Sequence, residues 1–141
     1  MSNTLRISEA TSLALHTAVL LAARPDGLHS AREIADTLHV SEAHLSKVLQ
    51  RLAHVGLVES VRGPRGGFRL AKSGDKIALL DVYQAIEGPL GSGSCLLGRR
   101  VCRGKTCVLG GLLGAVNKQV RDYLSKTRLS QLTHVYDGAR R

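Results

Sequence analysis

Aromatic residues are scarce in this chain of 141 residues, which has no tryptophan, one phenylalanine and three tyrosines. Proteins that bind single-stranded nucleic acid stack the bases on aromatic side chains, so this class is disfavoured. Acidic residues are also outnumbered, 11 against 20 lysines and arginines, and the formal net charge is +9. Such an excess indicates a polyanionic partner, nucleic acid before an anionic membrane. The composition therefore favours duplex DNA.

Long apolar runs are absent as well. The longest charge-free stretch near the N-terminus, from Ala10 to Ala23, has 14 residues. A membrane-spanning helix needs about 20 apolar residues, so this stretch is too short. It is also a poor signal peptide, because Glu9 stands where positive charge belongs and His16 interrupts the apolar region. We therefore expect a cytoplasmic protein without a membrane partner.

Cysteines are few, and Cys95, Cys102 and Cys107 lie within 13 residues of one another. An odd number at such close spacing is a poor disulfide framework. It is more typical of a metal-binding or redox-active group.

Three helices are predicted in the first part of the chain. The first runs from Ser8 to Ala23, and the second begins at Ser30, which forms a capping box with Glu33. Ser41 can cap the third. Its buried stripe consists of Leu45, Val48, Leu49, Leu52 and Val55. Two short capped helices joined by a tight turn are typical of a helix-turn-helix.

A β-hairpin is predicted directly after these helices. Leu57–Val61 and Phe68–Leu70 have the character of strands, and Arg62–Gly67 forms a glycine-rich turn between them. A short helix follows from Leu79 to Glu87. The predicted fold class is mainly α with a small β-hairpin wing, a winged helix-turn-helix over residues 1–88.

The second part of the chain differs in composition. Residues 88–141 hold 10 basic and 2 acidic residues, whereas residues 1–87 hold 10 and 9. Glycine is concentrated between Gly88 and Gly114, with 8 of the 15. We therefore separate a cysteine-containing loop, residues 89–108, from a C-terminal part, residues 109–141.

Apolar residues recur at helical spacing in that C-terminal part, over about 17 residues. They are Leu109, Leu112, Leu113, Val116, Val120, Tyr123 and Leu124. We expect no later element large enough to cover them, so a second copy of the chain is the simplest partner. We predict a long dimerisation helix followed by a tail. The alternative is that the helix folds back onto its own winged helix.

Several segments together resemble a known family. They are Leu5–Ser8, Ser41–Leu45, Leu52–Val58, the wing Val61–Leu70 and the cysteine cluster. In these segments the chain is similar to winged-helix regulators of the IscR/NsrR type, over nearly its whole length. The resemblance implies a homodimeric transcription factor, mostly a repressor in that family, which binds a palindromic operator in double-stranded DNA. It also implies an iron–sulfur cluster held by three cysteines of each subunit.

The candidate DNA contacts lie on the third helix and on the wing. Ser41, Ala43, His44 and Lys47 are placed to meet base edges in the major groove. Arg62, Arg65 and Arg69 suit phosphates or an adjacent minor groove. We interpret Gln50, Arg51 and His54 as a solvent-facing surface without a DNA contact.

The cysteine spacing is Cys95-x6-Cys102-x4-Cys107. Structural zinc sites usually have paired C-x2-4-C knuckles and four ligands, which this spacing does not match. A glycine-rich loop can wrap a cluster, and the neighbouring Arg99, Arg100, Arg103 and Lys105 would offset its negative charge. Relative to the family the middle cysteine is displaced by one residue, so [2Fe–2S] and [4Fe–4S] both remain open. Zinc or a thiol switch without a cluster is the alternative.

Three cysteines leave room for another ligand. In part of the family a histidine follows the last cysteine by three residues, but Gly110 stands there. In others the ligand comes from the first helix of the opposite subunit, and the resemblance at Leu5–Ser8 places Ser12 and His16 at those positions. His16 is the first choice, because imidazole is the better iron ligand, and Glu9 is the second. Alternatively, His16 packs at the subunit interface.

The favoured hypothesis is a dimeric regulator whose operator binding is controlled by a cluster that senses redox state, nitric oxide or iron–sulfur status. A less favoured alternative is an iron–sulfur electron-transfer or docking protein. No nucleophile–base pair or phosphate-binding motif stands out, so we expect neither an enzyme nor a small-molecule substrate.

Overall fold

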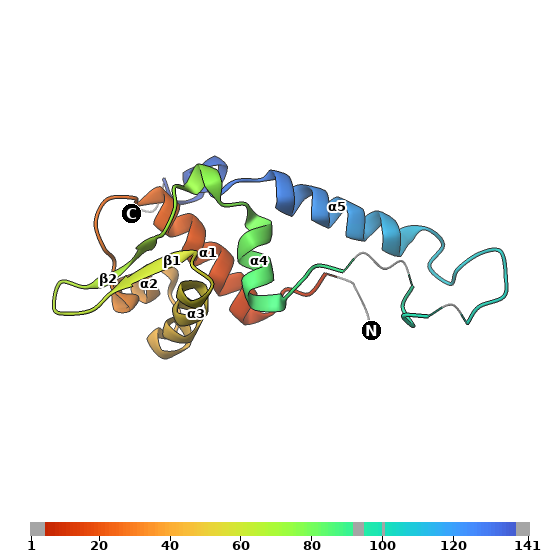
Figure 1. Cartoon of the computed structure of the whole chain (residues 1–141), viewed down its shortest axis with the longest axis horizontal. Helices are drawn as coiled ribbons and strands as arrows, with labels where there is room; N and C mark the ends of the chain where they lie inside the picture. Colours follow the sequence, from red (N-terminus) through yellow and green to blue (C-terminus); the bar gives the residue numbers. More distant parts are fainter. Residues whose placement is uncertain (1–4, 92–94, 100, 138–141) are drawn as a thin grey trace.

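The computed structural model describes residues 5–91, 95–99 and 101–137. The elements are α1 Glu9–Ala23, α2 Ala31–Leu38, α3 Glu42–His54, β1 Val58–Val61, β2 Gly67–Leu70, η1 Gly74–Lys76, α4 Leu79–Glu87, α5 Leu112–Lys126 and η2 Leu129–Tyr136, where η marks a 3₁₀ helix (Figure 1). Helices dominate, and the strands form one two-stranded sheet. The predicted fold class, a mainly α winged helix, is confirmed.

Serine caps fix the starts of the first three helices. The hydroxyl of Ser8 accepts a hydrogen bond from the backbone N–H of Thr11, and Ser30 accepts one from Glu33. Ser41 does the same for α3. Each bond satisfies a backbone donor that has no partner within the helix. The capping box predicted at Ser30 consists of two hydrogen bonds, and the one accepted by the Ser30 hydroxyl is observed. The Glu33 carboxylate instead lies 3.4 Å from Nδ1 of His29.

The hairpin pairs β1 with β2 in antiparallel register, with Val58 opposite Leu70 and Glu59 opposite Arg69. The backbone of His29 bridges to Phe68, which ties the segment before α2 to the hairpin. Gly67 makes this approach possible, because its φ is 155° and a Cβ there would lie 2.7 Å from the carbonyl oxygen of His29. The wing is thereby anchored to the helices.

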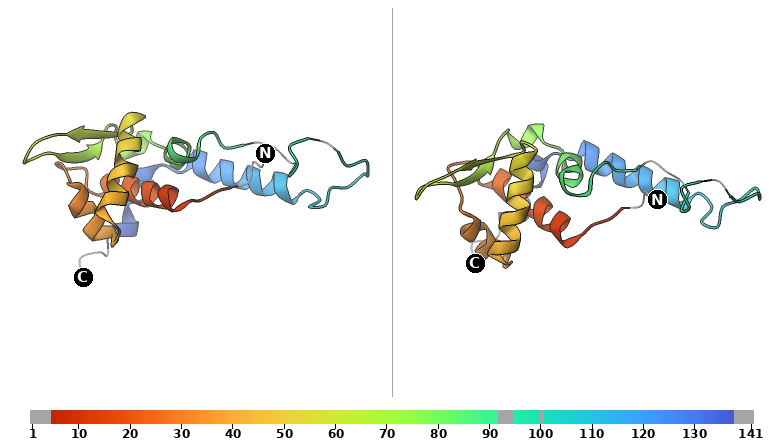
Figure 2. Two further views of the ribbon diagram at one scale, coloured as in Figure 1. Left: turned by 90° about the horizontal axis from the view of Figure 1, so that it is seen from below. Right: turned by 60° about the horizontal axis from the view of Figure 1, so that its bottom comes forward.

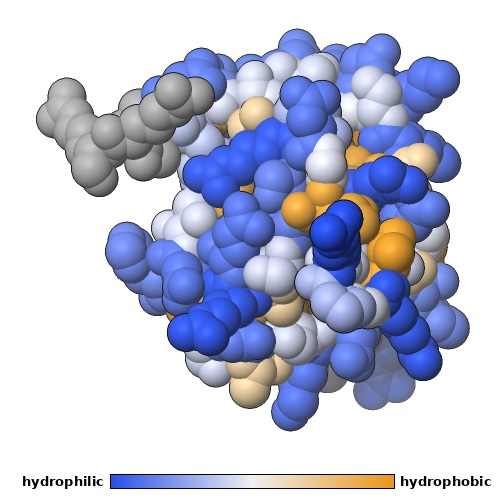
Figure 3. Space-filling view, turned by 90° about the vertical axis from the view of Figure 1, so that its left-hand side faces the viewer, coloured by the Kyte–Doolittle hydropathy of each residue, from blue (hydrophilic) through white to orange (hydrophobic). Residues whose placement is uncertain are grey.

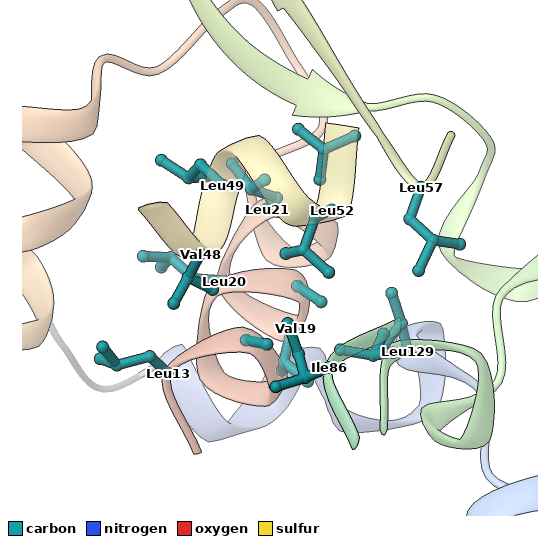
Figure 4. Packing of buried hydrophobic residues seen from close by; sticks show 14 of the residues in the cluster. Leu13, Val19, Leu20, Leu21, Val48, Leu49, Leu52, Leu57, Ile86 and Leu129 are labelled. Atoms are coloured by element: carbon teal, nitrogen blue, oxygen red, sulfur yellow. The ribbon is translucent and has the colours of Figure 1, made fainter. Parts of the chain in front are cut away.

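The hydrophobic core lies between α1, α3, α4 and η2 (Figure 4). Leu20 and Leu21 of α1 pack with Leu49 and Leu52 of α3, and all four are at most 2% exposed. Leu129 of η2 is 0% exposed. The buried stripe predicted for α3 is therefore correct except at Val55, which is 51% exposed because it lies beyond the last helical turn.

The η2 helix is a feature that the sequence reading missed. Leu132 and Tyr136 pack against the core, and the Tyr136 hydroxyl donates a hydrogen bond of 3.1 Å to the backbone oxygen of His16. The predicted C-terminal tail thus contains a segment that returns to α1.

The molecule is elongated, with the wing and the cysteine loop at opposite ends (Figure 2). Leu113 and Leu124 of α5 are buried, but Leu112 and Tyr123 are each 57% exposed and Val116 is 36% exposed. The helix therefore has an apolar face that the described part of its own chain leaves open. Across the described residues, no helix combines the length and hydrophobicity needed to cross a membrane.

Candidate functional site

The recognition surface begins with α3. Ala43 and Lys47 are exposed, and the His44 side chain is 37% exposed, on the side of the helix opposite the buried leucines. The Ser41 hydroxyl accepts a hydrogen bond of 3.3 Å from the backbone N–H of His44. Ser41 therefore both caps the helix and lies beside the candidate base contacts.

The wing carries three further cations. Arg62, Arg65 and Arg69 are all exposed, and hydrophilic side chains cover most of the end of the molecule from which the hairpin projects (Figure 3). Gly63 has a φ of 110°, which supports the tight turn between the strands. The turn thus holds two arginines at the tip and the third on β2.

Two carboxylates lie close to candidate DNA contacts, in pairings that the sequence did not predict. Glu59 accepts a hydrogen bond of 2.8 Å from Nε of Arg69 across the hairpin, and this bond raises the pKa of Arg69. Glu9 lies 3.7 Å from Nδ1 of His44, which places the second-choice metal ligand beside the recognition helix. The Glu59–Arg69 pair could have been predicted from the register of the hairpin, because the two residues stand directly opposite each other.

Arg51 is exposed, as the sequence predicts, and its side chain also bonds to another helix. Its Nη2 donates a hydrogen bond of 2.6 Å to the backbone oxygen of Ile86, at the end of α4. The residue therefore links α3 to α4, and only Gln50 and His54 of the supposed solvent-facing group are exposed without such a bond.

The three cysteines line one open pocket of about 790 Å³. All three are free of disulfides, Cys95 is half-buried, and Cys102 and Cys107 are exposed. Lys105 and three glycines, Gly104, Gly110 and Gly111, line the same pocket. Arg99 and Arg103 are exposed in the loop, whereas Arg100 lies outside the described residues. The donor set, three thiols in one glycine-rich hollow with a cation, suits a cysteine-ligated cluster.

The thiols are not assembled at ligand distances. Within residues 5–91, 95–99 and 101–137, no three side chains among His, Cys, Asp and Glu are close enough to hold a metal ion. His16 is exposed on α1, where its Nδ1 lies 2.7 Å from the backbone oxygen of Ser12. Together with Glu9 near His44, this leaves both candidate fourth ligands outside the cysteine pocket of their own chain.

An exposed recognition helix followed at once by an arginine-bearing hairpin defines a winged-helix DNA-binding protein. The model of the Rrf2 family, described as an iron-dependent transcriptional regulator, matches residues 7–135. The chain belongs to this family of transcriptional regulators. The family confirms the resemblance to regulators of the IscR/NsrR type and the expectation that the chain is no enzyme.

Individual relatives agree with this assignment. The chain is 30% identical over 125 residues to the transcriptional regulator NsrR of Bacillus subtilis (strain 168), covering 86% of this chain and 83% of NsrR. It is 42% identical over 83 residues to BadM of Rhodopseudomonas palustris (strain ATCC BAA-98 / CGA009), covering 59% of this chain and about half, 53%, of BadM.

A solved structure is similar over nearly the full chain. CymR, titled the global cysteine regulator of B. subtilis, has a TM-score of 0.79 and 29% identity, covering 95% of this chain and all of CymR. Relatives of different regulatory type therefore share this fold.

Proposed function

We propose that the chain is a homodimeric regulator, most simply a repressor, that binds a palindromic operator under the control of an iron–sulfur cluster. The observation that carries this proposal is the pairing of a cationic winged-helix surface with three free thiols in one pocket, in a member of an iron-dependent family.

DNA binding is assigned to α3 and the wing. In this proposal α3 enters the major groove, where Ala43 packs on a thymine methyl and Lys47 or His44 hydrogen-bonds guanine. Ser41 lies at the same end of the helix. Arg62, Arg65 and Arg69 contact phosphates or the neighbouring minor groove. Their exposure supports this assignment.

Cys95, Cys102 and Cys107 would hold the cluster, and His16, or less favourably Glu9, would complete it from the partner subunit. The shared pocket supports the cysteine set. A cluster with one non-cysteine ligand supplies a point of attack for small oxidants such as nitric oxide or oxygen. Lys105 and the loop arginines would offset its negative charge, for either nuclearity.

The dimer would form through α5. Its exposed residues Leu112, Val116 and Tyr123 share one side of the helix, because their spacing follows helical periodicity. A two-fold dimer places two recognition helices at a fixed separation, and DNA half-sites repeat at helical-turn intervals. A change in the loop beside α5 that alters this separation would therefore lower operator affinity.

The deciding experiment is chemical analysis of anaerobically purified protein. We expect iron, sulfide and visible absorbance in the wild type, and their loss in Cys102→Ala. Protein without iron and sulfide, or operator binding that is unchanged in Cys102→Ala, would contradict cluster control.

A second candidate keeps DNA binding and replaces the cluster with a thiol switch or zinc. The exposure of Cys102 and Cys107 and the similarity to a cysteine regulator favour this alternative. Zinc without sulfide, or DNA affinity that depends on oxidant in metal-free protein, would select it.

A further inference from the structure

The residues that lead into the cysteine loop are contacted by three separate elements. Residues 86–91, called the stem below, start in the last turn of α4 and end shortly before Cys95. Side chains from α3, from the start of α1 and from α5 hydrogen-bond to this stem.

The first contact comes from the recognition helix. Arg51 lies in the last turn of α3, and its Nη2 donates to the backbone oxygen of Ile86 over 2.6 Å. The carbonyls at the end of a helix have no partner within it, and a cation there is favoured by the helix dipole. This bond joins α3 directly to the start of the stem.

The second contact comes from the start of α1. The Glu87 carboxylate accepts a hydrogen bond of 2.6 Å from the hydroxyl of Ser8 and another from that of Thr11. Because Ser8 caps α1, the stem is attached to the helix that forms the centre of the core.

The third contact comes from α5. Nη2 of Arg121 donates to the backbone oxygens of Leu90 and Gly91, over 2.6 and 3.1 Å. The Leu90 side chain is 6% exposed and belongs to the core cluster. The far end of the stem is therefore held to the proposed dimerisation helix.

We propose that the stem couples the cysteine loop to the recognition helix, with Arg51 and Arg121 as its positioning residues. The proposal rests on the proposed function, because DNA affinity is the property that the coupling changes. Because the stem is hydrogen-bonded at both ends, a displacement of the loop also displaces the stem. The displacement is transmitted through Arg121 to α5 and through Arg51 to α3.

Hydrogen exchange tests this coupling without DNA. The full chain is compared with its thiols free and with all three alkylated by N-ethylmaleimide, as verified by mass. Wild type, Arg51→Ala and the control Gln50→Ala are measured, since Gln50 is an exposed neighbour on the same helix. Alkylation should change exchange of α3 amides by about fivefold or more in wild type and Gln50→Ala, and leave Arg51→Ala unchanged.

A second variant distinguishes a loss of coupling from a local folding defect in α3. Arg121→Gln removes the other anchor, far from α3 in the sequence, and should also abolish the response of α3 to alkylation. Wild type without a response, or Arg51→Ala and Arg121→Gln with the wild-type response, would overturn the coupling.

DNA binding separates this proposal from the function on which it rests. A duplex selected from a random library by free-thiol wild type is titrated at several salt concentrations. If no duplex is selected, or if binding does not depend on salt, the proposed function is wrong. The hydrogen-exchange result would still hold in that case. For Arg51→Ala the affinity should fall with an unchanged salt slope, whereas a slope reduced by about 1 would identify a phosphate contact and refute the positioning role.

Discussion

Carboxylates compete with DNA for candidate contact residues. To make the proposed phosphate contact, Arg69 must exchange Glu59 for the phosphate or reach it while still bonded to Glu59, because their side chains lie 2.8 Å apart. Glu59 is itself exposed on the wing and repels the DNA backbone. We therefore expect Glu59 to weaken DNA binding through both effects.

Glu59→Gln should raise affinity for duplex DNA. An exposed ion pair is worth at most about 1 kcal/mol, so the gain should not exceed about fivefold from the released Arg69. Fluorescence anisotropy titration measures it. Asp26→Asn, which makes the same charge change at an exposed position outside the hairpin strands and their turn, is the control. Equal affinities for Glu59→Gln and wild type would contradict this role of Glu59.

Glu87 should give the protein an acid-sensitive contribution to stability. The hydrogen bond from Ser8, followed by that from Thr11, lowers the pKa of Glu87 below its usual value of 4.5. A group with a depressed pKa in the folded state stabilises above its unfolded pKa, and this stabilisation is lost as pH falls through the folded value.

The comparison is between wild type and Glu87→Gln in urea unfolding from pH 7 to pH 3. Wild type should be more stable by a constant amount at neutral pH, and the difference should shrink below the usual glutamate pKa. A difference that is the same at both ends of the range would show that the charge of Glu87 does not contribute.

Among the elements, the hairpin depends most on a single residue. Gly67→Ala places a Cβ 2.7 Å from the His29 carbonyl oxygen at a φ of 155°. Because backbone atoms cannot move aside easily, we expect a loss of about 3 kcal/mol in the free energy of unfolding. Gly63→Ala also has a positive φ but meets nothing within 4 Å, so its loss should be smaller, and equal losses would argue against the close approach as the cause.

Local signals made the first elements predictable. Ser8, Ser30 and Ser41 mark helix starts by a mechanism that acts within one turn, and the predicted α4, Leu79–Glu87, agrees with the structure at both ends. The η2 helix escaped prediction because its burial depends on α1, which is more than 100 residues away in the sequence. Its single fully buried leucine, Leu129, gave no helical stripe to recognise.

The same distinction applies to the site. The cysteines and the exposed cations could be found from residue type and spacing alone. The bond between Arg51 and Ile86 could not, because it depends on how α3 and α4 pack. Its place on the helix therefore predicted the exposure of Arg51 but not the residue to which it bonds.

At the scale of the whole molecule, the apolar face of α5 should determine the assembly. Val116→Glu places a charge between Leu112 and Tyr123, so a dimer that buries this face should dissociate. Sedimentation should give twice 15.1 kDa for wild type and 15.1 kDa for the variant. Lys118→Gln, which lowers the net charge by the same amount at an exposed position on another side of the helix, should remain dimeric. A dimeric Val116→Glu would place the interface elsewhere.

The return of η2 to α1 also has a consequence for biosynthesis. Leu129 is completely enclosed by the core, so the winged helix lacks one of its own packing partners until translation has passed residue 129. Contacts between such distant segments form slowly, because a long loop must close before they are made. The loop that is closed here contains all three cysteines. The thiols consequently leave the ribosome before the core is complete, and a nascent chain can meet metal or oxidant before its DNA-binding domain is finished.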